Sequence, residues 1–438
     1  MKLIKVIADI VCTTLFDPDV LAKARRRKGA FTRNNGKLSY LTVLKLLLKN
    51  VKRTISSVLD EFFMTIDRAS GFSMDRVSGC SHQAYSKARS GIDHTIFKEC
   101  FSRMLDFLCS QEMIENQERI HGLWGIQPIA IDGSRIDLPN RKILKDKYGG
   151  CGRDGSSPTA LASIAYDVLR GIILDADIDA LSVGERILAK RHLENIMIHK
   201  RVNLMYAMFV FDRGYASKDL IKYIMNVLHS CYLFRVRQKF NLDIDALPIP
   251  QGDEIIDAAV AIDPEITVRV LRFRLSSGIV ETLITNAFGV SQSMFKLLYA
   301  MRWPVEGNYD LIKNKIGLTN FNGYSENSIL QEFWISVLMA NFTNLTAKEV
   351  DGIIKGSSIS GDNKHVYKVN INELVGCISR CLPDYLDADT TYEKHCILHH
   401  IVIYGLRNKV VDKRGSNESV PRKEPRKVKH HFNRKTSH

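Results

Sequence analysis

The chain has 438 residues, 45% of them hydrophobic and 25% charged, and a net charge of +14, which is the composition of a globular protein rather than a disordered or fibrous one. No apolar run reaches the ~20 residues that span a bilayer, and the first 21 residues lack a signal-peptide pattern. Nine scattered cysteines, an odd number, argue against a disulfide framework and predict reduced thiols in a cytoplasmic protein.

The positive charge lies in two segments near the chain ends. Residues 23–53 contain eleven Lys or Arg and no acidic residue, and residues 407–438 carry a net charge of +8. The rest of the chain is mildly acidic. Such segments suit a polyanion, because each neutralised phosphate releases condensed counterions. Either segment alone would indicate a solvated surface, but two that flank a carboxylate site predict a nucleic-acid partner.

The first ~115 residues are predicted to be helical, because apolar residues recur at three- and four-residue spacing. After Gly79, Ser81 is a good N-cap for a short polar helix. That helix would display His82, Gln83, Tyr85, Lys87 and Arg89. A turn followed by such a helix resembles the reading half of a helix-turn-helix. A plain surface helix in a bundle explains the segment somewhat better.

The middle of the chain changes to an α/β pattern. The segment IQPIAIDGSRIDLP predicts a strand, and TALASIAYDV and GIILDADI predict two more, joined at Arg170-Gly171. A helix, the apolar strand NLMYAMFVFD, a second helix and the strand CYLFRVR follow. The order β-β-β-α-β-α-β indicates an α/β core. Residues 238–286 then read as a mostly β insertion, and helix returns at about Ser291.

Three acidic residues on these elements are the candidate catalytic centre. Asp132 closes the first strand before a Gly133-Ser134 turn, Asp212 ends the fourth strand, and Glu306 lies on the later helix. Ligands bind at adjacent strand ends in open α/β sheets. Three carboxylates suit Mg²⁺ or Mn²⁺. Two such ions about 3.5–4 Å apart can activate the attacking oxygen and stabilise the leaving oxygen in phosphoryl transfer.

The helix around Glu306 makes this signal specific. It contains Tyr299, Arg302, Glu306 and Lys313, spaced as Y-x2-R-x3-E-x6-K. At 100° per residue these four side chains share one helical face, where Arg and Lys can hold a DNA phosphate. Pro304 predicts a kink or restart of the helix. A salt-bridged surface helix is the weaker interpretation.

These motifs, with AIDGS upstream and FDRGY between, resemble the DDE transposases of bacterial insertion sequences that carry the Tyr-Arg-Glu-Lys motif. The resemblance implies an α/β fold: a ribonuclease-H-like catalytic core with a β-rich insertion, a helical N-terminal domain and a basic C-terminal region. It implies that Asp132, Asp212 and Glu306 bind the metal ions, and that Tyr299, Arg302 and Lys313 contact DNA. The implied reaction is hydrolysis at the transposon ends, through a DNA hairpin in some relatives, and attack of the freed 3′-hydroxyl on target DNA.

The expected organisation is a DNA-binding region over residues 1–118, a catalytic domain over 119–355 with its insertion at about 238–288, and a C-terminal region over 356–438. The expected partners are the terminal inverted repeats and target DNA, with a homodimer on DNA as the active form. Two other functions remain open, which are a metal-dependent nuclease without strand transfer and a domesticated DNA-binding protein.

A zinc site is a further, weaker possibility. Cys377-x3-Cys381 and His395-x3-His399 have nearly the spacing of zinc ligands. Each pair would also face one side of a helix if it were only packed in a core, and the intervening stretch lacks the core pattern of a zinc finger. We therefore expect these residues to be structural.

Overall fold

Nine strands form one mixed sheet in the computed structural model, which describes residues 1–31, 36–49, 54–69, 71, 79–110, 125–152, 155–275, 277–358 and 365–412. Their order across the sheet is β2-β3-β1-β5-β6-β9-β8-β7, and β4 also pairs with β3. The strands are β1 (Gln127–Asp137), β2 (Gly150–Cys151), β3 (Ser157–Asp167), β4 (Ile172–Ala180), β5 (Ala207–Phe211), β6 (Cys231–Arg235), β7 (Ile255–Asp263), β8 (Ile266–Arg274) and β9 (Val280–Thr285).

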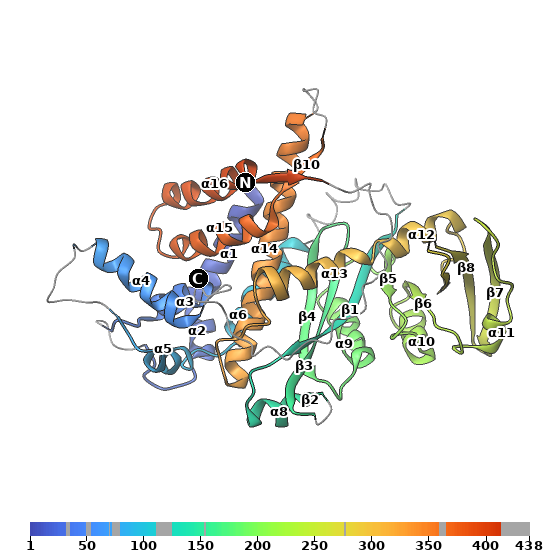
Figure 1. Ribbon diagram of the computed structural model, residues 1–438, viewed down its shortest axis with the longest axis horizontal. Coiled ribbons are helices and arrows are strands. Elements are labelled where there is room, and N and C mark those ends of the chain that lie inside the picture. Colours follow the sequence, from blue (N-terminus) through green and yellow to red (C-terminus); the bar gives the residue numbers. More distant parts are fainter. Residues whose placement is uncertain are drawn as a thin grey trace.

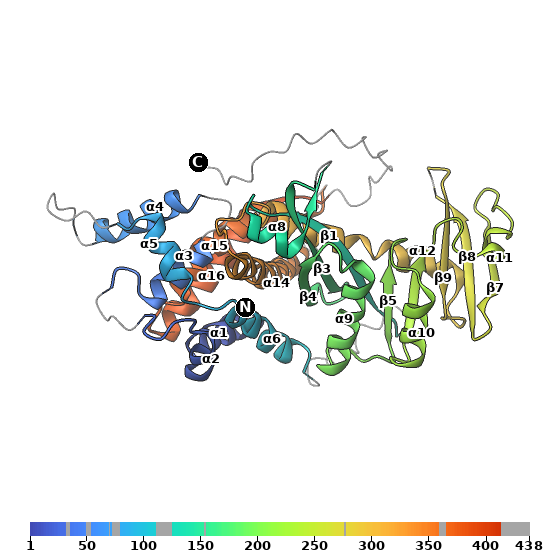
Figure 2. The same ribbon diagram turned by 90° about the horizontal axis from the view of Figure 1, so that it is seen from below.

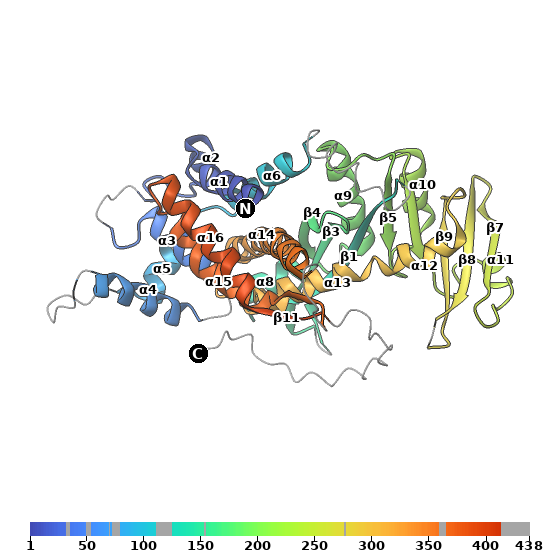
Figure 3. The same cartoon turned by 90° about the horizontal axis from the view of Figure 1, so that it is seen from above.

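The predicted order of strands and helices is confirmed, with the short helix α8 (Lys142–Tyr148) and β2 added after the first strand. The predicted turn at Arg170-Gly171 joins β3 to β4, and Gly171 has a φ of 75° there. All five residues of β5 are buried, as expected for a central strand that is covered on both faces. Helices α9 (Glu185–Ile198) and α10 (Lys218–Asn226) lie on one face of the sheet, and α12 (Gln292–Ala300) and α13 (Trp303–Asp310) lie on the other (Figures 2 and 3).

The first strand is longer than the sequence predicts. β1 runs parallel to β5 only as far as the pair Ile131–Phe211, but it continues to Asp137 because β3 pairs with it antiparallel. Asp132 therefore lies within β1, opposite Ile164, and Gly133-Ser134 is strand rather than turn. Asp132 and Asp212 still adjoin, since each is the residue directly after the last β1–β5 pair.

The β-rich insertion extends the same sheet. Its strand β9 pairs with β6 of the core, β8 pairs with β9, and β7 forms the outer edge (Figures 2 and 3). The short helix α11 (Leu242–Asp245) precedes these strands. The hydrogen-bonded ladder therefore passes without a break from the core into the insertion.

Helices from both ends of the chain pack together beside the core (Figure 1). The N-terminal helices are α1 (Lys2–Phe16), α2 (Pro18–Ala24), α3 (Tyr40–Lys49), α4 (Ile55–Ala69), α5 (His82–Arg89) and α6 (Thr95–Leu108). The C-terminal elements are α14 (Glu326–Ser358), β10 (Tyr367–Val369), α15 (Ile371–Tyr385), α16 (Thr391–Arg407) and β11 (Lys409–Val411). Most of the C-terminal basic segment, and Arg33, Lys52 and Arg53 of the N-terminal one, lie outside the described residues.

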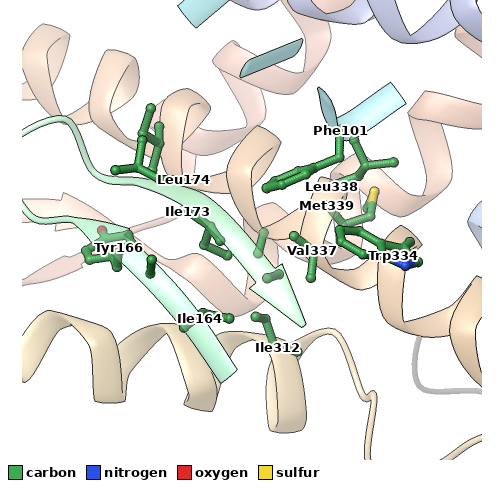
Figure 4. Packing of buried hydrophobic residues seen from close by; sticks show 14 of the residues in the cluster. Phe101, Ile164, Tyr166, Ile173, Leu174, Ile312, Trp334, Val337, Leu338 and Met339 are labelled. Atoms are coloured by element: carbon green, nitrogen blue, oxygen red, sulfur yellow. The ribbon is translucent and has the colours of Figure 1, made fainter. Parts of the chain in front are cut away.

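The long helix α14 joins the helical region to the sheet. Figure 4 shows Trp334 and Leu338 of α14 near Phe101 of α6, and Val337 near β4. The Asn341 side chain accepts a hydrogen bond from the Ile173 backbone at 2.7 Å and donates one to its carbonyl at 3.0 Å. Asn341 thereby occupies the polar groups of an edge strand that would otherwise be unpaired. No helix within the described ranges is long and apolar enough to span a membrane.

The short polar helix forms as α5, and the Ser81 side chain caps it as predicted by accepting from the Ala84 backbone. Two of its five supposedly displayed side chains are nevertheless buried, namely Tyr85 and Arg89. Arg89 pairs with Glu332 of α14 at 2.9 Å. The helix is therefore docked onto α14 by one side, which leaves a smaller surface for reading DNA than the sequence suggested.

Candidate active site

The first two carboxylates come from neighbouring strands at the carboxyl end of β5. The side chain of Asp132 is 20% exposed and that of Asp212 is 38% exposed, so both can be reached from solvent. The turn after β5 is closed by the Tyr215 amide, which donates to the Asp212 carbonyl at 3.2 Å. Apolar residues bury both strands up to these positions, and each strand delivers its aspartate at the point where burial ends.

The third carboxylate lies just after a break in the helix. Helix α12 ends at Ala300, and α13 begins at Trp303 with Pro304 in its first turn. The restart predicted from Pro304 is confirmed, and it follows from the missing amide hydrogen and fixed φ of proline. After α13 the chain makes one π-helical segment, η2 (Leu311–Lys315). The side-chain direction of Lys313 therefore depends on this wider turn as well as on the residue spacing.

Three of the four motif side chains contact the two aspartates or the strand that carries Asp132, and the fourth, Glu306, is linked to Asp132 through Arg302. The Tyr299 hydroxyl donates to Asp212 Oδ1 at 3.2 Å. The Arg302 guanidinium lies 2.8 Å from Glu306 Oε1 and 3.7 Å from Asp132 Oδ2. Lys313 Nζ donates to Ser134 Oγ at 2.7 Å and to the Arg135 carbonyl at 2.5 Å. The polar side chains of the motif thus link the segment from α12 to η2 to both strands.

The three carboxylates form one cluster without being in full contact. Among the described residues, no choice of one oxygen from each of these three carboxylates gives atoms that all lie within 4.8 Å of one another. Arg302, which is only 5% exposed, contacts both Asp132 and Glu306 and supplies their opposite charge. A buried guanidinium between two carboxylates lowers their mutual repulsion. It also occupies space that a cation bound to both would share.

A fourth carboxylate, which the sequence analysis missed, borders the two aspartates. Glu185 lies in the first turn of α9. A β-carbon built on Gly133 would lie 3.2 Å from Glu185 Oε1, and one on Gly214 would lie 3.0 Å from Oε2. Neither glycine has a positive φ, so a larger residue at either position would be limited by this close approach of Glu185 rather than by backbone conformation. The sequence carries only an indirect signal of this contact, which is a glycine one residue after Asp132 and another two residues after Asp212.

Arg235 and Glu281 add a second ion-pair chain on the insertion side. Arg235 lies 3.7 Å from Asp212 Oδ1 and contacts Glu281, whose side chain is only 4% exposed. Arg235 ends β6 and Glu281 lies on β9, so the pairing of these two strands brings both to the site. The residue spacing carries no sign of this contact, because it depends on how the insertion joins the sheet.

Two tyrosines lie beside Asp132 and Gly133 at the site. The Tyr309 hydroxyl donates to the Asp132 carbonyl at 2.7 Å and so ties α13 to β1. The Tyr215 hydroxyl is buried and has no hydrogen-bond partner within the described part of the chain. It would lie 3.2 Å from a β-carbon on Gly133, beside Glu185. A buried hydroxyl left unpaired next to carboxylates marks a place where a further polar group can bind.

The electrostatics of the cluster favour the arrival of positive charge. Burial raises the pKa of Asp132 to about 6, against the lowering effect of Arg302, and the nearby charges of Glu185 and Asp212 add to the rise. Burial also raises the pKa of Glu185, with a further contribution from Asp212. The carboxylates of the site (Asp132, Glu185, Asp212, Glu281 and Glu306) also outnumber the guanidiniums of Arg213, Arg235 and Arg302 that contact them. Oxygen donors with this excess charge fit a hard divalent cation.

A sheet of this order, with acids at adjoining strand ends and a third acid on the following helix, defines a ribonuclease-H-like core of the kind that acts on phosphodiester bonds. The family described as "Transposase DDE domain" matches residues 123–342, which is half of the chain. The chain belongs to this family and is a transposase, a polynucleotidyl transferase that acts on DNA. Members of the family generally depend on divalent metal ions.

Among solved structures, the chain resembles a piggyBac transposase synaptic complex with hairpin DNA, determined by cryo-electron microscopy. The TM-score is 0.50 and the sequence identity is 12%, over 90% of this chain and 85% of that chain. This likeness concerns the fold and confirms the ribonuclease-H-like architecture. A search of curated proteins finds no significant match.

Proposed function

We propose that this transposase cuts the ends of a mobile DNA element and joins the freed 3′-hydroxyls to target DNA, with Asp132, Asp212 and Glu306 as its metal-binding catalytic residues. One observation carries the assignment of residues. Asp132 and Asp212 directly follow the last residue pair of two parallel strands, and the motif residues Tyr299 and Arg302 contact these two carboxylates.

The three carboxylates fit Mg²⁺ or Mn²⁺ because they offer hard oxygen donors in a site where carboxylates outnumber guanidiniums. Two such ions, when bound, would activate the attacking oxygen and stabilise the leaving oxygen. The protein's own part is to hold Asp132 and Asp212 at adjoining strands and Glu306 on α13, while Arg302 favours the ionised form of Asp132 against the effect of burial. Glu185 adds negative charge beside Asp132 and Asp212, and we assign it a positioning role at the same site.

We assign DNA contacts to Tyr299, Arg302 and Lys313, which touch protein groups in the structure described above. Arg302 neutralises Asp132 and Glu306 in the protein alone. Once metal ions supply that charge, its planar guanidinium becomes available for a phosphate. Lys313 lies beside Ser134 and Arg135, just past Asp132 on the same strand, where a DNA backbone that enters the site would pass.

A basic cavity next to the site supports DNA binding from the insertion side. The cavity has a volume of about 610 Å³ and lies beside Arg235, which contacts Asp212. Its basic lining residues are Arg213, Arg235, Arg237, Lys239 and Arg272. Three of their guanidiniums are already engaged, since Arg213 and Arg235 contact Glu281 and Arg272 donates to the carbonyls of Ile244 and Leu247. Arg237 and Lys239 are exposed and can meet phosphates.

The other parts of the chain are assigned by the same reasoning. We propose that residues 1–118 bind the terminal inverted repeats, that residues 119–355 form the catalytic domain, and that residues 356–438 add non-specific contacts through their basic tail. Coordinated cutting of two ends makes a homodimer on DNA the expected active form, acting on the nucleoid in the cytoplasm. A hairpin intermediate is named for the structural neighbour, and we propose it for this chain too.

The decisive experiment uses the full chain and labelled DNA from both flanks of its coding region, where the inverted repeats are sought. We expect Mg²⁺-dependent cleavage at the repeats, a hairpin product on a denaturing gel, and joining to a target plasmid. Asp132→Asn should bind the same DNA without cutting it. Cleavage without joining would indicate the nuclease alternative, and binding with no Asp132-dependent cleavage would indicate the DNA-binding alternative. Equal cleavage in chelator would refute the metal assignment.

A further inference from the structure

A second cluster of metal-ligating side chains lies far along the chain from the carboxylates, between α15 and α16. Cys377 and Cys381 are on α15 and His400 is on α16. Each offers one ligand atom, and the three atoms all lie within 4.8 Å of one another. They are the one such group among the residues that the structure describes. Helices α15 and α16 pack directly against each other, so the cluster bridges two elements (Figure 1).

The distances and the donor types select the metal. Cys377 Sγ and Cys381 Sγ are 3.9 Å apart. Two sulfurs each about 2.3 Å from a tetrahedral zinc ion are separated by roughly 3.8 Å. The two cysteines are four residues apart and so share one face of their helix. Soft sulfur donors combined with an imidazole suit Zn²⁺ and exclude Mg²⁺. Cys377 is fully buried and His400 is exposed, which leaves a path for the ion to enter.

The histidine that completes this cluster differs from those that the sequence suggested. His395 and His399 are exposed, and their rings stack on each other at 6.3 Å between centroids. His400 faces the cysteines instead, because the packing of α16 turns that side of the helix toward α15. Cys396 lies one helical turn before His400 and is exposed. A change of its rotamer could bring a third thiolate toward the same point.

We propose that Cys377, Cys381 and His400 bind a structural zinc ion, with Cys396 as the fourth ligand. The set then has the pattern C-x3-C on one helix and C-x3-H on the next, with 14 residues between them. In a hairpin of two helices with a short turn, residue pairs at this spacing lie at similar distances from the turn and so face each other. A closed site of three thiolates and one imidazole is a structural rather than a catalytic one.

The zinc would hold a hairpin that anchors the N-terminal helices. At the turn end of the hairpin, the Tyr385 hydroxyl donates to Asp9 Oδ1 at 2.7 Å, and Lys45 Nζ pairs with Asp387 at 2.6 Å. Both contacts join residues more than 300 positions apart. A metal ion that binds only the folded chain raises its stability by mass action. This role is independent of the proposed catalytic residues.

The test is metal analysis of the full-length protein purified under reducing conditions. We expect about one zinc ion per chain by inductively coupled plasma mass spectrometry. After exchange with Co²⁺ we expect a thiolate-to-metal charge-transfer band in the absorption spectrum. Cys381→Ser and His400→Gln should lose the zinc and unfold at a lower temperature. His399→Gln, next to His400 on the same helix, is the matched control and should keep both. Cys396→Ser should keep bound Co²⁺ with a weaker thiolate band.

Several results would overturn the proposal. They are the absence of zinc together with no Co²⁺ band on reduced thiols, equal metal content in Cys381→Ser and the wild type, or loss of zinc in His399→Gln alone. A Cys377–Cys381 disulfide in thiol titration would assign the pair to redox chemistry instead. An unchanged Co²⁺ spectrum in Cys396→Ser would remove the fourth ligand and leave an open three-ligand site. If Cys381→Ser does not fold, the Co²⁺ titration of His400→Gln decides the question.

Discussion

The carboxylate of Glu185 lies so close to Gly214 that a β-carbon there would be 3.0 Å from Oε2. The same carboxylate limits the space at Gly133 on β1. Gly133 directly follows Asp132 and Gly214 lies two residues after Asp212, so the first turn of α9 lies against both strands near these two aspartates. This contact makes the position of Glu185 testable by adding a single methyl group.

We predict that Gly214→Ala displaces Glu185 and lowers cleavage while the protein stays folded. Loss of a group that orients metal ligands typically lowers metal affinity or activity by about 10–100-fold. The measurement is Mn²⁺ binding by electron paramagnetic resonance together with the cleavage rate. Gly352→Ala is the control, because a β-carbon at this site on α14 meets nothing within 4 Å. It should keep activity and stabilise the helix by about 0.5–1 kcal/mol.

Metal binding should weaken as the pH falls through about 6. The pKa of Asp132 is raised to about 6, chiefly by burial, so below that pH a proton competes with the metal for this carboxylate. We expect the Mn²⁺ dissociation constant of the DNA-free protein to increase toward pH 5 and to level off above pH 7. In Glu185→Gln the transition should move to lower pH, because Glu185 raises the Asp132 pKa. An unchanged dissociation constant from pH 5 to 8 would contradict this.

Asp132→Asn should abolish cleavage and make the fold more stable at neutral pH. Because the folded pKa of Asp132 lies above its unfolded value of 3.8, folding stability falls as the pH rises between those two values. Removal of the charge should recover about 1–2 kcal/mol at pH 7.5, since partial exposure and the loss of the Arg302 contact reduce the full effect. Urea unfolding at pH 7.5 and pH 4 measures this gain, which should disappear at pH 4. If Asp132→Asn is less stable than the wild type at pH 7.5, the charge on the Asp132 carboxylate does not destabilise the fold.

Arg302→Lys should separate cleavage from DNA binding. The guanidinium contacts Asp132 and Glu306 together, and a lysine ammonium cannot copy this planar bridge. We expect cleavage to fall by about 10–100-fold, with DNA affinity within a few-fold of the wild type. Gel shift and single-turnover cleavage on the same DNA provide the comparison. If DNA affinity and the cleavage rate fall equally, the role of Arg302 is limited to DNA binding.

Arg237→Ala should lower the salt dependence of DNA binding. Arg237 lines the basic cavity and is exposed, so it can neutralise a phosphate and release a counterion. The slope of log affinity against log salt should become shallower by about 1. Lys355→Ala, an exposed residue near the end of α14, is the charge-matched control and should leave the slope unchanged. The same change of slope in both variants would point to a general charge effect.

Local signals in the sequence were enough to predict the order of strands and helices along the chain, the β character of the insertion and the helix restart at Pro304. Each depends on periodicity or on the covalent geometry of one residue. The true length of β1 could not be predicted, because the antiparallel partner β3 carries the strand beyond Asp132. The burial of Tyr85 and Arg89 in α5 has the same cause, since α14 lies more than 230 positions away along the chain.

Residues whose role depends on packing between distant elements were missed. Glu185 has no motif around it, and only its contact with Gly133 and Gly214 marks it. Arg235 and Glu281 meet because β6 pairs with β9 across the start of the insertion. In the cysteine–histidine cluster the spacing drew attention to His395 and His399, whereas the rotation of α16 against α15 selects His400. Such a rotation depends on the side chains of both helices, so the sequence of one helix alone cannot predict it.

The pairing of β6 with β9 means that the insertion cannot be removed as a separate module. Its loss would expose the backbone amides and carbonyls of β6 along a new open edge, two strands from β1, and such edges recruit other chains into aggregates. It would also take away Glu281, the buried partner of Arg235, and Arg235 itself contacts Asp212. Related transposases are therefore expected to vary this region by lengthening or shortening its outer loops, while the strand next to β6 is always kept.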